Sequence, residues 1–312
     1  MYAVTIHKFG SPDVLTYEEV DDPEIKTGEV LVKVHAVGIN PIDCMTRAGT
    51  GVNRSWKEDR FPVILGWDIS GVVVESKADD VAPGDEVYGM PRFPEITGGY
   101  AELVASPAAH LAAKPSNLDH VHAAAVPLAA LTAWQSLIEK ADIQAGQRVL
   151  IHAAAGGVGH FAVQFAKWRG AHVIATASGA NEGFVKALGA DEFVDYTAGP
   201  FEDAIAPVDV VYHTIPRPLL AQSFKVLKRG GTMITITAGP IPEEDMKAHD
   251  AKGGFVGVRP SAEHLAQIAT LIEEGSVMPE VGHVYPLKEM AKAHAQSETK
   301  HTRGKIVLEV GG

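Results

Sequence analysis

Three glycines lie in a short run of small residues suited to binding an anion. The run, AAAGGVG at residues 153–159, follows the apolar stretch QRVLI and precedes HFAVQFAKWRG, a pattern that predicts a strand followed by a helix. Aligned with the dinucleotide-binding fingerprint, Ala154, Gly156 and Gly159 take its three glycine positions. Gly156 would let the backbone approach a pyrophosphate, and the N–H groups at the helix start would bind it. The alternative is a tight turn with no ligand.

The end of the second predicted strand indicates which dinucleotide this would be. An NAD site generally has an Asp or Glu there, which accepts hydrogen bonds from the ribose 2′-hydroxyl. Here the strand ends in ATASGAN, with Ser178 and Asn181 and no acid before Glu182. Hydroxyl and amide groups accommodate a 2′-phosphate, so NADP(H) is the predicted cofactor. Lys186 and Arg303 are the candidate cations for that phosphate, and the alternative for each is a solvated surface charge.

Two parts of the chain with different patterns of predicted strands and helices position these residues. From about Asp119 a helix leads into alternating strands and helices, with strands predicted at RVLIHA, HVIATA, EFVDY, VDVVYHTI, TMITITA and GFVGV. This alternation predicts an α/β fold with a doubly wound parallel sheet of six strands, the Rossmann arrangement, over residues 120–259. The first third has short apolar or alternating runs separated by Gly, Pro and Asp, which predicts an antiparallel, barrel-like domain. Residues 260–312 resemble it in texture, so residues 1–119 and 260–312 are predicted to form one domain.

Composition excludes several classes of protein. The 312 residues carry a formal net charge of −12, which argues against nucleic-acid and membrane partners. Cys44 is the only cysteine, so no internal disulfide and no cysteine-rich zinc site is possible. We find no signal-peptide pattern and no stretch suited to span a bilayer. A cytoplasmic location is expected.

Several further motifs point to one family. They are AVGINPIDCMTRAG, PVILGWDISGVV, VAPGDEVYG, GGYAEL, AAAVPLAALTAW, VLIHAAAGGVG and GKIVLEV. In this order the chain resembles the zinc-independent quinone oxidoreductase and enone reductase branch of the medium-chain dehydrogenase/reductase superfamily. The resemblance implies a GroES-like β-barrel-type catalytic domain beside the Rossmann domain. It also implies a homodimer paired through sheet edges near GTMITITAG and GGFVGVR.

The resemblance also implies functional residues. Asn40 and Thr132 would be catalytic, near the nicotinamide ribose or the substrate. The implied cofactor-binding residues are Ala155, Gly156, Gly157, Val158 and Gly159 at the pyrophosphate, Ser178, Tyr196 and Arg303 at the adenosine phosphate end, Thr214 and Ile215 lining the cofactor cleft, and Ile236, Thr237, Ala238, Gly239, Val258 and Arg259 on the nicotinamide side. Tyr196 could instead only pack, and Thr132 could bond within its own helix.

No metal is expected. Zinc-dependent members of the superfamily carry Cys at the position of Asn40, Gly-His-Glu at Gly66, Trp67 and Asp68, and a further Cys near residues 126–128, so the ligand set is missing here. The chain also departs from the quinone oxidoreductases. The loop at residues 49–61 lacks their tyrosine and offers Arg54, Trp56 and Arg60 instead, and a lysine that often follows the Ser178 position is absent.

These features predict an NADPH-dependent oxidoreductase that transfers a hydride to a small conjugated carbonyl acceptor, a quinone or the C=C bond of an enone or enal. Without zinc, the acceptor carbonyl is polarised by hydrogen bonds or a nearby cation, and Asn40 or a ribose hydroxyl is the expected donor. A short-chain dehydrogenase is excluded, because no tyrosine is followed four residues later by lysine. An NADPH-binding protein with a structural or regulatory role and little turnover stays open as the alternative.

Overall fold

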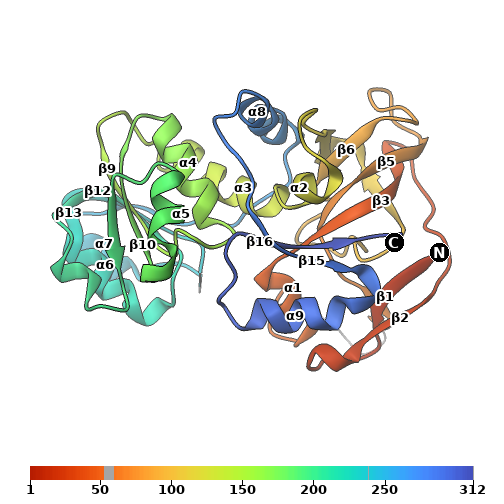
Figure 1. The fold of residues 1–312 in the computed structure, drawn as a ribbon, viewed down its shortest axis with the longest axis horizontal. Coiled ribbons are helices and arrows are strands. Elements are labelled where there is room, and N and C mark those ends of the chain that lie inside the picture. Colours follow the sequence, from red (N-terminus) through yellow and green to blue (C-terminus); the bar gives the residue numbers. More distant parts are fainter. Residues whose placement is uncertain (53–59, 238, 312) are drawn as a thin grey trace. The chain divides into compact units, whose positions relative to one another are not determined.

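The computed structural model describes residues 1–52, 60–237 and 239–311, which divide into two compact units (Figure 1). The first is Met1–Leu131 with Arg259–Gly312, and the second is Thr132–Val258. From the sequence the boundaries were expected at 119/120 and 259/260. The first unit includes more of the chain because helix α2 (His120–Ala124) packs on its strands β3 and β5.

A six-stranded parallel sheet forms the centre of the second unit, which confirms the predicted Rossmann fold. Its strands are β9 (Arg148–Ile151), β10 (His172–Ala177), β11 (Glu192–Asp195), β12 (Val208–His213), β13 (Leu227–Thr235) and β14 (Lys252–Phe255). Their order is β11-β10-β9-β12-β13-β14. The chain therefore reverses direction across the sheet between β9 and β12, and such a reversal opens a crevice at the carboxyl ends of the strands.

Within the described residues, four α-helices lie in the connections between these strands. They are α4 (Gly159–Trp168), α5 (Glu182–Ala187), α6 (Leu220–Val226) and α7 (Glu243–Ala248). Because parallel crossovers are right-handed, α4 and α5 lie on one face of the sheet and α6 and α7 on the other. Two predictions were inexact. Residues 227–231 belong to β13 rather than to the helix predicted over residues 217–231, and α7 was not predicted.

The first unit contains two sheets. The smaller has the order β2-β1-β4, and the larger has β15-β16-β3-β5-β6-β8 with β7 also paired to β3. The strands are β1 (Tyr2–Ile6), β2 (Leu15–Glu19), β3 (Glu29–Ile39), β4 (Val63–Ile64), β5 (Asp68–Ser76), β6 (Glu86–Gly89), β7 (Leu103–Pro107), β8 (Leu111–Ala113), β15 (Val281–Pro286) and β16 (Lys305–Glu309). Buried side chains of β3, β5 and β16 contribute to the core of this unit.

The helices of the first unit are α1 (Pro41–Arg47), α2, α8 (Ala262–Glu273) and α9 (Met290–Glu298). The single long helix predicted after Asp119 is broken. It consists of α2, then α3 (Pro127–Trp134), then a π-helical segment, Gln135–Lys140. The break comes at Pro127, which lacks the N–H needed to continue α2. Among the described residues, every helix is too short or too polar to cross a membrane.

Candidate functional site

The glycine-rich run forms the turn from β9 to α4, and two close contacts set its shape. Ala153 has a φ of +48°, a left-handed conformation that costs a residue with a Cβ about 1–2 kcal/mol. The Ala153 carbonyl oxygen accepts a hydrogen bond from the Gly156 N–H at 2.9 Å. A Cβ at Gly159 would lie only 2.1 Å from the same oxygen. Gly159 is therefore required for α4 to begin this close to the strand.

Gly156 differs from Gly159 because it has space in front of it. A Cβ there would lie 3.3 Å from the Ala153 oxygen and near no other described atom beyond its chain neighbours. The N–H groups of Gly157 and Val158 have no acceptor within the described parts of the chain. They stand at the N-terminus of α4, the positive end of its dipole. Free N–H groups and room for a close approach fit the pyrophosphate of a dinucleotide.

Two threonines join the carboxyl ends of the strands next to this turn. Thr214 Oγ1 donates to the His152 carbonyl at 2.7 Å and links the ends of β12 and β9, across the reversal of strand order. Thr237 Oγ1 donates to the Ile215 carbonyl at 2.9 Å and links β13 to β12. Thr214, Ile215 and Thr237 therefore form a hydrogen-bonded rim where doubly wound sheets bind their ligands.

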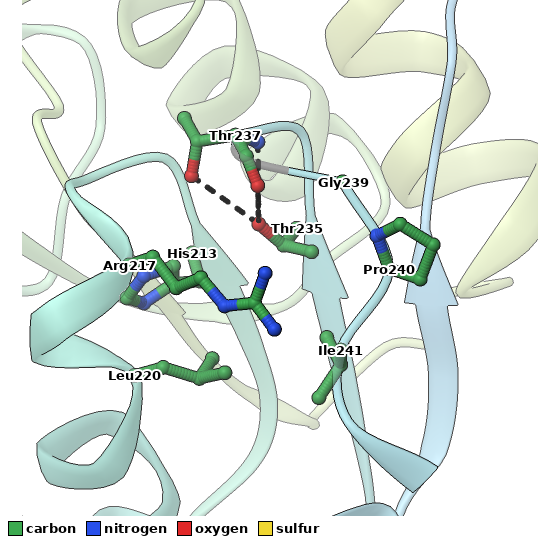
Figure 2. A pocket seen from close by; sticks show the side chains of 8 residues that line it. All are labelled: His213, Arg217, Leu220, Thr235, Thr237, Gly239, Pro240 and Ile241. Atoms are coloured by element: carbon green, nitrogen blue, oxygen red, sulfur yellow. Dashed lines mark hydrogen bonds between the residues drawn. The ribbon is translucent and has the colours of Figure 1, made fainter.

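A small pocket lies at the ends of β12 and β13 (Figure 2). It is lined by His213, Arg217, Leu220, Thr235, Thr237, Gly239, Pro240 and Ile241. The His213 ring is 1% exposed, and its Nδ1 lies 2.9 Å from Ser223 Oγ. Its Nε2 is buried without a partner among the residues that the structure describes.

Ser223 also connects His213 to a second buried histidine. His152 Nε2 lies 3.1 Å from Ser223 Oγ, and His152 Nδ1 lies 3.0 Å from Thr176 Oγ1. Burial lowers the pKa of His152 to about 3 and that of His213 to about 4, so both rings are neutral near pH 7. The network is thus a fixed set of neutral hydrogen bonds behind the strand ends.

The loop after β10 carries the groups expected at the adenosine end. Ser178 Oγ accepts a hydrogen bond from Asn181 Nδ2 at 3.0 Å, which holds the two predicted polar groups together. Lys186 forms an ion pair with Glu182 at 2.6 Å within α5, so this candidate cation already has a carboxylate partner. Tyr196 follows β11 and is 53% exposed, which leaves its ring available to a ligand.

The sequence reasoning missed an acid beside this loop. A Cβ at Gly179 would lie 2.5 Å from Asp195 Oδ2, so the carboxylate sits directly against the loop backbone. Hydrogen bonds from the Thr197 hydroxyl and N–H hold the pKa of Asp195 below its usual range, and it is ionised. Asp195 lies beside the Ser178 loop because it pairs with Ala177 in the parallel pairing of β10 with β11. The sequence could have indicated this only through the expectation that these two strands are neighbours.

Asn40, the predicted catalytic residue of the first unit, stands at the N-terminus of α1, but its side chain does not cap that helix. Its Nδ2 donates to Asp68 Oδ2 at 2.9 Å, and its Oδ1 accepts a hydrogen bond from Lys305 Nζ. Lys305 Nζ also lies 3.3 Å from Asp68 Oδ2. The three side chains, here called the Asn40 triangle, are 2%, 0% and 3% exposed for Asn40, Asp68 and Lys305.

The strand register explains why these residues meet. In the pairing of β3 with β5, Gly38 lies opposite Asp68, and in the pairing of β16 with β3, Ile306 lies opposite Ile39. Lys305 and Asn40 are 265 residues apart in the chain, which is why the sequence reasoning missed the cation. In the sequence, the only indications of this cluster were the GKIVLEV motif, which contains Lys305, and Asp68 in the GWD motif.

Burial and hydrogen bonding act on the Asp68 carboxyl in opposite directions. Burial raises the pKa of Asp68 above its usual range, while the Lys305 ammonium and the hydrogen bonds from Asn40 and from the Leu128 N–H, at 2.8 Å to Oδ1, favour the ionised form. A second buried acid, Asp43, accepts the Asn40 backbone N–H at 2.6 Å, while its Oδ1 has no partner among the described residues. Burial, and further the nearby charge of Asp68, raise the pKa of Asp43 to about 8, so it holds a proton near pH 7.

Trp67, at the second would-be metal position, is part of the core. Its Nε1 donates to the Glu95 carbonyl at 2.7 Å, its ring packs edge-on against Phe93, and it is 1% exposed. Over residues 1–52, 60–237 and 239–311, no group of three or more His, Cys, Asp or Glu side chains is arranged to hold a metal ion.

The predicted cofactor residues of the second unit gather at one edge of its sheet, because each stands at or soon after the carboxyl end of a parallel strand. They are Ala155, Gly156, Gly157, Val158, Gly159, Ser178, Tyr196, Thr214, Ile215, Ile236, Thr237, Gly239 and Val258. Thr132 begins the second unit and is 5% exposed, and its carbonyl lies 3.4 Å from Tyr212 Oη. Asn40, Arg259 and Arg303 belong to the first unit. Ala238, Arg54 and Trp56 lie outside the described residues.

Comparisons with known proteins match both units. Residues 26–116 match the family described as alcohol dehydrogenase GroES-like domain, and residues 188–308 match the family described as zinc-binding dehydrogenase. The chain is 34% identical over 320 residues to the chloroplastic NADPH-dependent alkenal/one oxidoreductase of Arabidopsis thaliana, over 99% of this chain and 79% of that protein. It is 32% identical over 323 residues to the quinone oxidoreductase of Sus scrofa, over 97% of this chain and 95% of that protein.

A solved structure shows the same fold. The quinone oxidoreductase from Coxiella burnetii is 36% identical and superposes with a TM-score of 0.93 over 99% of both chains. A chain with this fold and these relatives is an NAD(P)-dependent oxidoreductase of the medium-chain dehydrogenase/reductase superfamily. Within it, the chain belongs to the branch of the quinone oxidoreductases and enone reductases, which confirms the resemblance found in the sequence.

Proposed function

We propose that this protein is an NADPH-dependent, zinc-independent reductase of conjugated carbonyl compounds, either quinones or the C=C bond of enones and enals. The start of α4 carries the proposal, because Gly156 leaves space there and the Gly157 and Val158 N–H groups are free to bind phosphate. The relatives support the acceptor class, since two are named for quinones and for alkenals and alkenones.

The chemistry divides between the cofactor and the chain. When bound, NADPH supplies a hydride from C4 of its nicotinamide and water supplies a proton, so the acceptor gains two hydrogens while NADPH becomes NADP⁺. The chain holds the pyrophosphate at the start of α4 and the nicotinamide end at the rim of Thr214 and Thr237. The Asn40 amide would donate a hydrogen bond to the carbonyl oxygen of the acceptor. A conjugated acceptor spreads the negative charge over its own π-system and needs less help than a simple ketone, which favours it in a site without zinc.

The preference for NADPH is supported by the polar loop after β10. Ser178 and Asn181 offer a hydroxyl and an amide to a 2′-phosphate, and the Arabidopsis thaliana relative is named NADPH-dependent. The carboxylate of Asp195 beside Gly179 opposes an additional phosphate charge. Fluorescence titration with NADPH and with NADH tests the preference, and equal or tighter binding of NADH contradicts it.

Metal independence is supported by the hydrogen bonds of Asn40 and Trp67, which stand at positions where zinc-dependent relatives carry metal ligands. Asn40 Oδ1 is bonded to an ammonium group and the Trp67 indole to a carbonyl, so neither is available to a cation. We expect elemental analysis of active enzyme to show substoichiometric zinc and chelation to leave activity unchanged. Stoichiometric zinc that is lost together with activity refutes this part of the proposal.

Steady-state oxidation of NADPH tests the reaction itself. We expect turnover with members of a panel of quinones and enones, and much slower turnover with simple ketones of similar size. Reduction of simple ketones but of no conjugated acceptor contradicts the reaction class. Tight NADPH binding with no turnover on any acceptor favours a binding protein instead.

A homodimer is proposed on the exposed edge of the second unit's sheet. β14 is the last strand in the sheet order, and Phe255 on it is 42% exposed. An unpaired edge with an exposed aromatic side chain is suited to pairing with a second copy. Light scattering tests this, and the mass of a single 33.1 kDa chain contradicts it.

A further inference from the structure

We propose that Lys305 is a positioning residue that orients and polarises the Asn40 amide, so that its free N–H faces and stabilises the developing oxyanion of the acceptor. The inference rests on the proposed reductase function, since it says how charge on the acceptor oxygen would be stabilised without zinc. It begins from the Asn40 triangle, in which a buried cation touches the one predicted catalytic amide of the first unit.

The triangle leaves one donor on Asn40. An asparagine amide has one oxygen and two N–H hydrogens. The oxygen is bonded to Lys305 and one hydrogen to Asp68 Oδ2 at 2.9 Å. The second hydrogen has no acceptor among the described residues. Because the N–H lies in a buried site, a hydrogen bond that it gives to a ligand is stronger than one given in water.

The same contacts fix which way the amide points. Rotating the amide by 180° would place its oxygen against the Asp68 carboxylate and its NH₂ against the Lys305 ammonium. Both pairs are repulsive, so only one orientation is stable. A helix N-terminus usually uses an Asn side chain as its cap. Here the Asn40 backbone N–H is bonded to the Asp43 carboxyl group, while the Asn40 side chain is bonded to Asp68 and Lys305.

The ammonium also changes the strength of the donor. A hydrogen bond from a charged donor to the amide oxygen draws electron density away from the nitrogen and makes the remaining N–H a better donor. Asp68 has the opposite effect through the other hydrogen and balances the charge of Lys305, so that the buried cation is tolerated. The arrangement places a positive charge behind the amide without exposing that charge to solvent, since Lys305 is 3% exposed.

Two variants of Lys305 test whether the positive charge of its side chain matters or only its hydrogen bonding and size. Lys305→Gln keeps a donor near Asn40 and Asp68 but removes the charge, and Lys305→Arg keeps the charge. Lys114→Gln is the matched control, because Lys114 is also a buried lysine of the first unit, 5% exposed at its side chain and paired with Glu86 at 3.5 Å. Thermal unfolding of each variant shows whether it folds.

The first readout is the selectivity between acceptors. We expect Lys305→Gln to lower kcat for an enone by roughly tenfold or more, with a smaller loss for a strongly oxidising quinone that needs less polarisation and little change in KM for NADPH. Lys305→Arg should recover part of the loss, and Lys114→Gln should reduce both acceptors at the parental rate. A Lys305→Gln enzyme that folds and keeps the parental kcat on both acceptors overturns the proposal, as does an equal loss on both.

The second readout needs no turnover. A nitrophenol added to the NADP⁺ complex reports by its absorbance how far the site favours the phenolate over the phenol. The parent should favour the phenolate and Lys305→Gln should lose that preference. A parent that shows no preference overturns the proposal. A parent that ionises the probe but reduces no acceptor overturns the proposed function and leaves the role of Lys305 supported.

Discussion

Gly156 and Gly159 stand three residues apart in the same turn, and we expect their alanine variants to fail in different ways. At Gly159 a Cβ would lie 2.1 Å from the Ala153 carbonyl oxygen, where ordinary contact begins at 3.4 Å, so the start of α4 would have to move by more than 1 Å. Overpacking of this kind costs about 1–3 kcal/mol. At Gly156 the nearest atom is 3.3 Å away, which requires a shift of only about 0.1 Å, and the backbone is not in the left-handed region, so we expect alanine to cost far less stability there.

The effects on NADPH should be reversed. With the pyrophosphate bound at this turn as proposed, a methyl group at Gly156 would prevent the close approach of the phosphate to the backbone and weaken a hydrogen bond from one of its N–H groups. A hydrogen bond to a charged group contributes about 1.5–3 kcal/mol, so Gly156→Ala should weaken NADPH binding by roughly tenfold to a hundredfold. Thermal unfolding and fluorescence titration of the two variants measure both quantities. Parental affinity in Gly156→Ala means that the pyrophosphate binds elsewhere, and parental stability in Gly159→Ala means that the close contact does not exist.

Three further predictions follow from buried or misplaced charges. Because the folded pKa of Asp43 is raised from 3.8 to about 8, its contribution to the free energy of unfolding is complete below pH 3.8 and is lost as the pH rises through 8, by up to about 1.4 kcal/mol per pH unit. Denaturation at pH 6 and pH 9 should therefore show that the stability of Asp43→Asn relative to the parent increases as the pH rises. Asp85 is the control, because it is an exposed acid that also accepts a hydrogen bond from an N–H three residues away, and Asp85→Asn should show no such increase. The same pH dependence in both variants contradicts a protonated Asp43 near pH 7. Asp195→Asn should improve the affinity for NADPH a few-fold and leave that for NADH unchanged, and an unchanged ratio in titrations means that the 2′-phosphate lies away from Gly179. Burial lowers the pKa of His152 to about 3, so the contribution of its neutral ring to the free energy of unfolding is present above pH 6.5 and is lost as the pH falls below that value. The NMR signals of the His152 ring should therefore keep the positions of a neutral imidazole from pH 7 to pH 5. A titration midpoint near pH 6.5 contradicts the buried geometry.

The glycine-rich turn between β9 and α4 was predictable because its determinants are local. A strand, three glycines and a helix lie within one short segment, and the requirement at Gly159 follows from the packing of that helix on that strand. The alternation of the later strands then implied the parallel sheet, since no other connection returns the chain to the same edge. The resemblance added the positions of residues such as Thr214, which the structure places at that edge.

The polar cluster of the first unit was not predictable, because it depends on contacts between distant segments. Asn40 could be named from its motif, but the register of β3 with β5 and β16 decides that Asp68 and Lys305 meet it. Asp195 was missed for the same reason, since only the pairing of β10 with β11 brings it to the Ser178 loop. Charge and hydropathy patterns along one segment carry no information about the register of another.

The place of β16 in its sheet has a consequence for how the chain is made. β16 lies between β15 and β3, and it follows every other strand of that sheet in the chain. On the ribosome, the contiguous segment of the Rossmann unit emerges as a whole before β16, whereas residues 36–39 of β3 lack the strand they pair with until residues 305–309 have been synthesised. Lys305 arrives with that strand, so the Asn40 amide gains its cation only after the other strands of that sheet have been synthesised. A protease that removes this strand would therefore disable the first unit while sparing the fold of the second.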